Sequence, residues 1–86
     1  MTMMPYAQLI TEARQAFEIR VNAVENICRE QLGREWRLLE NGGSISVKIE
    51  DQPREVLKEV VTRWNRAETG WAVQRPNDDT LVWWRR

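Results

Sequence analysis

The sequence TLVWWRR, residues 80–86, decides the fold of this chain. Its first five residues are β-branched, aliphatic or aromatic, which is typical of a β-strand. Because neighbouring side chains of a strand point to opposite faces of the sheet, Trp83 and Trp84 cannot both face the same layer. We therefore predict a central strand that places one tryptophan in the core and the other on the opposite face of the sheet.

A hairpin is predicted to join this strand to the residues before it. The WAVQR sequence at residues 71–75 is strand-like, and the PNDD sequence at residues 76–79 consists of residue types that favour tight turns. The predicted hairpin spans residues 71–85.

Two helices are predicted from apolar residues that recur every three or four positions. The first spans residues 5–32, with Gly33 as its left-handed C-terminal cap, and the second spans residues 52–69 and ends at Gly70. Asp51 is suited to cap the start of the second helix. The first helix is long for so small a domain, so we expect one end to protrude, bend or meet a partner chain.

A second hairpin is predicted over residues 36–50. Residues 44–50, SISVKIE, alternate polar and apolar side chains, as a strand with one buried face does. The NGG sequence at residues 41–43 favours the two-residue turn of a hairpin. Each half of the chain would then run helix, glycine, tryptophan and hairpin, which suggests an αββ unit used twice.

These elements predict an α+β fold in a single domain, residues 1–86. Its order is αββαββ, with a mainly antiparallel four-stranded sheet covered on one face by two helices in a two-layer arrangement. If residues 36–40 form a loop instead of a strand, the order becomes αβαββ and the sheet has three strands.

The composition excludes several classes of function. The 13 basic and 13 acidic side chains give zero formal charge, so no overall field attracts nucleic acid or an anionic membrane. A single cysteine allows no internal disulfide, and no run approaches the roughly 20 apolar residues that cross a bilayer. Residues 1–5 also lack the basic and apolar regions of an export signal. We expect a cytoplasmic protein with no membrane span.

The residues that most enzymes need are missing. The sequence has no His, the commonest general base and metal ligand, and its one cysteine, Cys28, falls on the apolar stripe of the first helix. The NGG sequence at residues 41–43 lacks the Lys of a phosphate-binding loop. Asp78 and Asp79 are explained by the turn that contains them. We expect a protein that is not an enzyme and holds no metal or cofactor.

Tryptophan and arginine supply the candidate binding surface. We interpret Trp36, Trp64 and Trp71 as structural, since each can cover part of the core. An exposed Trp next to Arg is typical of interface hot spots. The predicted partner-binding residues are Trp83, Trp84, Arg85, Arg86, Arg75 and Arg37.

Three functions fit this surface and the long first helix. The first is a protein-binding module. The second is a single-stranded nucleic-acid binder that stacks bases on the exposed tryptophan and neutralises phosphates with Arg. The third is a structural homo-oligomer, such as a homodimer, in which the long helix meets another copy through Leu9 and Ile19, which lie off its main apolar stripe.

The GWAV sequence at residues 70–73 and the LVWWRR sequence at residues 81–86 resemble short accessory proteins of tailed bacteriophages. Many of these proteins bind and block a host enzyme or defence complex, anti-CRISPR proteins among them. The resemblance therefore implies an inhibitor that acts in the cytoplasm of a bacterial host.

Overall fold

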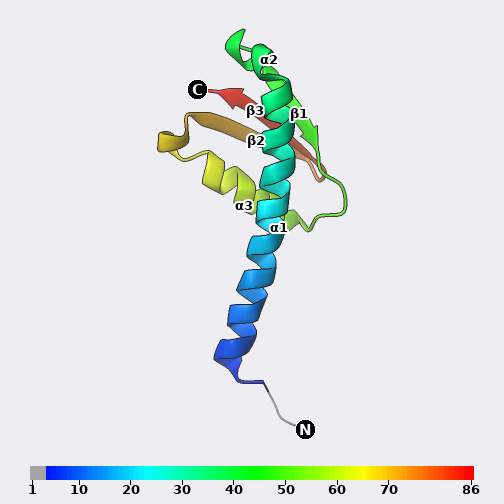
Figure 1. The fold of residues 1–86 in the computed structure, drawn as a ribbon, viewed down its shortest axis with the longest axis vertical. Helices are drawn as coiled ribbons and strands as arrows, with labels where there is room; N and C mark the ends of the chain where they lie inside the picture. Colours follow the sequence, from blue (N-terminus) through cyan, green and yellow to red (C-terminus); the bar gives the residue numbers. More distant parts are fainter. Residues whose placement is uncertain (1–3) are drawn as a thin grey trace.

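A computed structural model describes residues 4–86, apart from the side chain of Ala67. The prediction that residues 1–5 form no export signal concerns a segment that lies mostly outside the described residues. Figure 1 shows the elements in chain order. They are α1 (Tyr6–Arg34), α2 (Trp36–Glu40), β1 (Ser44–Lys48), α3 (Arg54–Trp64), the 3₁₀ helix η1 (Ala67–Thr69), β2 (Trp71–Asn77) and β3 (Thr80–Arg85).

The sheet is antiparallel and has three strands in the order β1-β3-β2. Strand β3 is central, as its apolar sequence predicts, and β2 and β3 form the predicted C-terminal hairpin. In the register, Trp83 lies between Ile45 of β1 and Val73 of β2. The four-stranded sheet is therefore wrong and the three-stranded alternative is confirmed, with the short helix α2 in place of a loop.

Residues 36–40 form a helix because the NGG sequence closes a helix instead of a hairpin. Gly42 adopts a left-handed φ of 81°, its N–H donates to the carbonyl of Leu39 at 3.1 Å, and the N–H of Gly43 donates to the carbonyl of Leu38 at 2.8 Å. This pair of bonds is the Schellman motif that ends helices. The predicted hairpin of residues 36–50 is thus absent, and the two halves of the chain do not repeat.

The helix ends also differ from the prediction. Helix α1 continues through Gly33 to Arg34, so of the two glycines predicted to end the long helices, Gly70 takes the left-handed conformation, with φ of 76°, and Gly33 does not. Helix α3 starts after Pro53 without a side-chain cap, and Asp51 instead lies in the preceding loop with φ of 61°. The second helical segment breaks after Trp64, where α3 ends and η1 follows three residues later.

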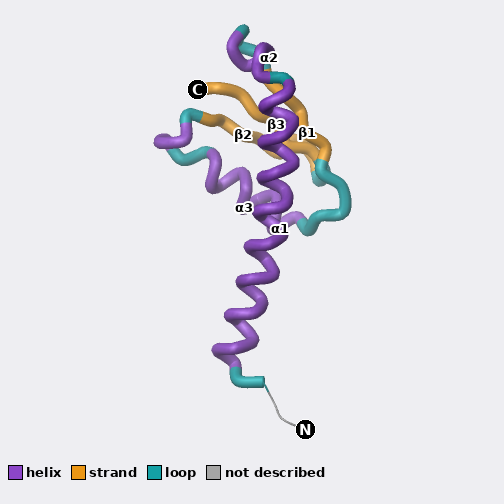
Figure 2. Tube along the Cα trace, viewed as in Figure 1, coloured by secondary structure: helices purple, strands orange, loops and turns teal. Residues whose placement is uncertain are grey.

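The core lies between one face of the sheet and the helices α1 and α3, and Figure 2 shows α1 passing across the strands. Alternate residues of the strands supply the sheet side, as the pleat requires. The sheet contributes Ile45, Val47, Val73, Leu81 and Trp83, α1 contributes Val21, Val24, Cys28 and Leu32, and α3 contributes Val56, Leu57 and Val60.

The fully buried side chains of α1 all lie in its second half, and Phe17 packs against the edge of the core. The first buried side chain of the helix is Val21, fifteen residues after its start at Tyr6. The first half extends away from the other elements (Figure 1), and the molecule accordingly measures 60 × 27 × 21 Å.

Side-chain amides bond to the backbone of both outer strands. Asn65 bonds to both backbone groups of Val73 on β2, donating to its carbonyl and accepting from its N–H, each at 2.8 Å. On β1, the amide of Gln31 donates to the carbonyl of Ser46 at 3.1 Å. These bonds occupy backbone groups that would otherwise be free to pair with another strand.

An ionic clamp ties α1 to α3 where α1 leaves the core. The guanidinium of Arg63 donates to both carboxylate oxygens of Glu18, at 3.0 Å for Nη1, and its Nε donates to Glu59 at 2.8 Å. Its hydrogen bonds to Arg63 hold the pKa of Glu18 below its ordinary value. Bidentate Arg–carboxylate pairs fix geometry as well as charge, so the clamp sets the direction in which α1 projects.

Two glycine substitutions should have opposite effects on stability. A Cβ at Gly43 would lie 2.9 Å from the backbone oxygen of Leu38, whereas one at Gly33 meets nothing within 4 Å. We expect Gly43→Ala to lower the free energy of unfolding by about 1–2 kcal/mol and Gly33→Ala to raise it by about 0.5–1 kcal/mol. Urea denaturation measures both. Equal stability of the two variants would contradict the Schellman cap.

Acid should weaken the clamp. The pKa of Glu18 is lowered in the folded state. Its contribution to the free energy of unfolding is therefore complete above the ordinary carboxyl pKa, and it is lost as the pH falls through the lowered pKa. We expect Glu18→Gln to be less stable than the parent at neutral pH, with the difference shrinking below about pH 4. Urea denaturation across pH tests this, with Glu12→Gln as an exposed control on the same helix. A difference independent of pH would argue against the assigned role.

Candidate partner-binding site

Three tryptophans meet edge to face around the central strand. Trp83 is fully buried, and its ring centroid lies 4.9 Å from that of Trp64 and 5.9 Å from that of Trp71, with interplanar angles of 84° and 90°. Trp64 and Trp71 contact each other at 6.1 Å. Such contacts add to the apolar burial of the rings. Trp83 therefore leaves the predicted binding set, because none of its surface reaches solvent.

Helix α1 holds the outer side of this tryptophan cluster. The indole N–H of Trp64 donates to the carboxylate of Glu25 at 2.7 Å, and the guanidinium of Arg29 lies 5.6 Å from the centre of a Trp64 ring. Burial raises the pKa of the Cys28 thiol to about 12. Cys28 is thus a protonated core residue at neutral pH, with little nucleophilic thiolate.

Trp84 lies on the face of the sheet opposite the helices. It is half-buried and stands between Ser44 of β1 and Ala72 of β2, with Val82 two residues before it on the same face. The alternation of Trp83 and Trp84 is the one predicted from the sequence. The open face offers a single partly covered indole flanked by small side chains.

The structure disperses the predicted arginines. Arg75 bonds to Asp78 at 3.2 Å near the hairpin turn, and Arg86 bonds to the carbonyl of Asn65. Arg37 of α2 stacks on Trp36, 5.5 Å from the ring centre. Only Arg85 enters a cavity, beside Trp71. The arginines therefore do not converge with Trp84 on the open face.

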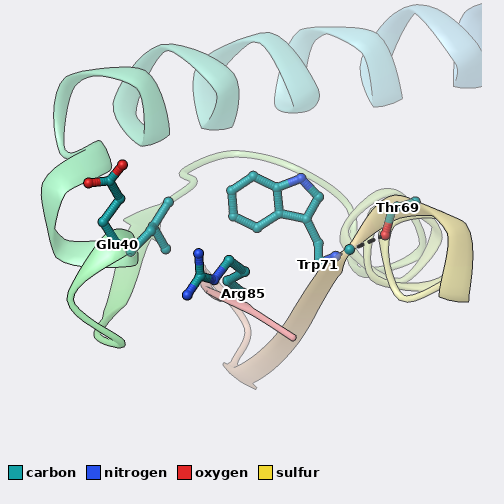
Figure 3. Close-up of a pocket in the computed structure, with 6 residues that line it drawn as sticks. Glu40, Thr69, Trp71 and Arg85 are labelled. Atoms are coloured by element: carbon teal, nitrogen blue, oxygen red, sulfur yellow. Dashed lines mark hydrogen bonds between the residues drawn. The ribbon is translucent and has the colours of Figure 1, made fainter.

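A groove with two adjoining hollows lies where α1 and α2 meet the start of β2. Figure 3 shows the first hollow, of about 360 Å³, in which the Trp71 indole lies above Arg85 and Glu40 stands on the wall formed by α2. Its lining is Leu39, Glu40, Thr69, Gly70, Trp71 and Arg85. The N–H of Trp71 donates to the hydroxyl of Thr69 at 3.1 Å, which fixes the backbone from which the indole projects.

The second hollow shares Leu39 and Trp71 with the first and measures about 300 Å³. Helix α1 and the tryptophans complete its lining with Arg29, Leu32, Gly33, Trp36 and Trp64. We call the two hollows together the aromatic groove. Gly33 forms part of its wall, and the absence of a side chain there keeps the second hollow open.

Large apolar side chains stand exposed on α2 beside the aromatic groove. Trp36 is 48% exposed and Leu38 is 47% exposed, although α2 is only one and a half turns long. Sequence reasoning missed this role of Trp36, because a strand at residues 36–40 would have placed its side chain at the end of the core. The NGG sequence at residues 41–43 was the available signal, since it also closes helices.

The two residues predicted for an oligomer contact are both exposed but do not share a face. Leu9 is 52% exposed and Ile19 is 69% exposed. Ten residues of α-helix separate their directions by about 80°. One flat helix contact cannot bury both side chains fully.

Two further observations bear on the kind of molecule. None of the helices between residues 4 and 86 combines the length and the apolar composition that a bilayer crossing requires. Comparison of the chain with protein-family models, with curated proteins and with solved structures finds no match.

The neighbouring tryptophans of β3 should differ in their effect on stability. We expect Trp83→Ala to lower the free energy of unfolding by about 3–5 kcal/mol, because it leaves a large cavity in the core. Trp84→Ala should cost roughly 1–2 kcal/mol, since its ring is already partly in water. Denaturation followed by far-UV circular dichroism measures both, and equal losses would contradict the orientation of β3.

Proposed function

We propose that the chain is a non-enzymatic protein-binding module whose aromatic groove receives an apolar segment of its partner. The observation that carries this proposal is the exposure of Trp36 beside a groove whose floor includes Trp71. A cluster of solvent-exposed tryptophan side chains is more often a binding site than a surface without a partner. The groove also has the concave, mostly apolar form of a site for an anchor side chain.

The charges around the aromatic groove define the partner further. Arg29 and Arg85 line it, Arg37 stacks on Trp36 beside it, and Glu40 is the acidic residue of its lining. This excess of guanidinium groups favours a segment in which acidic residues flank an aromatic or aliphatic anchor. Because the net charge of the chain is zero, the preference for acidic residues arises from the side chains at the groove and not from the charge of the whole molecule.

Strand addition is a less suitable mode of binding for this fold. Asn65 occupies both backbone groups of Val73 at one edge of the sheet, and Gln31 occupies a carbonyl at the other. A partner that paired with either edge would have to displace these amides. Insertion of side chains into the groove requires no such displacement.

Single-stranded nucleic acid is the second candidate ligand. Trp36 with Arg37 stacked on it could accept a base, and Arg29 and Arg85 could neutralise phosphates. Glu40 in the groove and Glu35 beside α2 oppose a phosphate backbone, and the balanced charge of the chain supplies no supporting field. We therefore rank protein binding first. A host enzyme or defence complex as the partner stays a prediction of the phage resemblance.

Peptide display against the immobilised protein tests the groove. Gly33→Leu would fill the second hollow without a clash at its Cβ, and Trp36→Ala removes the exposed indole. We expect both variants to lose the peptides that the parent enriches, by at least about tenfold in affinity. Trp84→Ala is the matched control, because it removes a partly exposed tryptophan from the other face of the sheet.

The outcomes separate the candidate functions. Loss of peptide binding only in Trp84→Ala would move the site to the open face and refute the groove. A labelled oligonucleotide that binds at low salt and dissociates as salt is added, with no peptide enriched, would favour nucleic-acid binding instead. Circular dichroism of each variant verifies that the loss is not a loss of folding.

A further inference from the structure

The projecting half of α1 carries an apolar stripe that runs from the exposed end of the helix to the edge of the core. Tyr6, Ile10, Ala13 and Phe17 fall within a sector of about 60° around the helix. We call these four residues the α1 stripe. Tyr6 is 79% exposed, Ala13 is exposed, and Ile10 and Phe17 are only partly covered. The stripe leads directly into the buried face that begins at Val21: Phe17 packs against the edge of the core, and Tyr6, Ile10 and Ala13 continue the same apolar face beyond it.

The order of side-chain sizes along the stripe suits an antiparallel pairing with itself. When two copies of the helix run in opposite directions about an axis between residues 11 and 12, Tyr6 of each copy lies opposite Phe17 of the other. In the same register, the large side chain of Ile10 lies opposite the small side chain of Ala13. Each contact occurs twice, as a two-fold interface requires. None of the four residues carries a charge, so no like charges meet at its centre.

A hollow between α1 and α3 can receive the N-terminal end of the second copy's helix. Beside Phe17, between α1 and the start of α3, lies a hollow of about 460 Å³. Its apolar lining includes Ala13, Phe17, Pro53 and Val56, and Arg20 and Glu55 stand at it as polar groups. Tyr6 and Phe17 are separated by about 16 Å along the helix, so the register above brings the Tyr6 ring of the second copy to this hollow. The polar residues are suited to its hydroxyl group.

We infer that the chain forms an antiparallel homodimer through the α1 stripe, with Tyr6 of each copy seated in the hollow between α1 and α3 of the other. The contact is small: two aromatic rings and their aliphatic neighbours would bury roughly 400 Å² per copy. Stable complexes bury about 800 Å² per partner. We therefore expect an association weaker than that of a stable complex. It leaves the aromatic groove free and does not depend on the proposed function.

Sedimentation of the full chain over a range of concentrations tests this dimer. The mass should rise from 10.2 kDa toward twice that value as concentration increases. Tyr6→Ala and Ile10→Glu should weaken the association at least about tenfold. Ile19→Glu should leave it unchanged, because this exposed side chain points about 150° away from the stripe. All three residues lie outside the core, and circular dichroism verifies that the variants fold.

Disulfide trapping tests the direction of the helices. Leu9 and Ala16 lie on the same flank of the stripe. In an antiparallel pair, Leu9 of one copy approaches Ala16 of the other. A mixture of the Leu9→Cys and Ala16→Cys variants should therefore form a disulfide between the two variants when it is oxidised. In that arrangement, the two Ala16 positions are about 13 Å apart along the axis and should not cross-link to each other. The buried thiol of Cys28, with its pKa raised to about 12, stays out of the reaction.

Three results would overturn the proposal. A mass of 10.2 kDa at every concentration would rule out the homodimer. Equal weakening by Ile19→Glu would place the contact elsewhere on the molecule. Efficient cross-linking of Ala16→Cys alone would show that the two helices meet in a different arrangement, in which Tyr6 does not lie opposite Phe17.

Discussion

The burial of Trp83 is the constraint on which the other features of this molecule depend. Trp64 of α3 and Trp71 of β2 meet its ring edge to face, so one side chain joins the helical layer to the sheet. With Trp83 turned inward, strand alternation directs Arg85 to the helical side, next to Trp71, and Trp84 to the open face. Trp71 thus belongs both to the core and to the aromatic groove.

The sequence predicts the strongly patterned parts of this fold and misleads where one signal has two meanings. Alternation at residues 44–50 and the LVWW sequence at residues 81–84 correctly predicted β1 and the central strand β3. The NGG sequence at residues 41–43 fits either a hairpin turn or a helix end, and a five-residue helix such as α2 is too short to reveal a period. Because of this ambiguity, the sequence prediction placed Trp36 on a strand and did not find the side of the aromatic groove that α2 forms. The positions of Arg37 and Arg75 depend on tertiary contacts that no local pattern encodes.

The two candidate surfaces lie at opposite ends of an elongated molecule. The aromatic groove is near the C-terminal end of α1, and the α1 stripe occupies its N-terminal half, with the Glu18–Arg63 clamp between them. An antiparallel pair would therefore direct its two grooves away from each other. If both proposals hold, the assembly presents two identical sites with a fixed separation, and a partner that displays the recognised segment twice would be bound with an avidity set by that spacing.

The amides of Asn65 and Gln31 have a consequence for how crowded copies of this protein behave. A small β-sheet with free edges can serve as a template on which further strands zip together into fibrils. Here, backbone groups of both outer strands are already bonded within the chain. A strand from another copy that approached Val73 or Ser46 would therefore have to displace an amide before it could pair there. A carboxylate in place of the Asn65 amide would have no N–H to donate to the carbonyl of Val73, and it would free that carbonyl at the edge of the sheet.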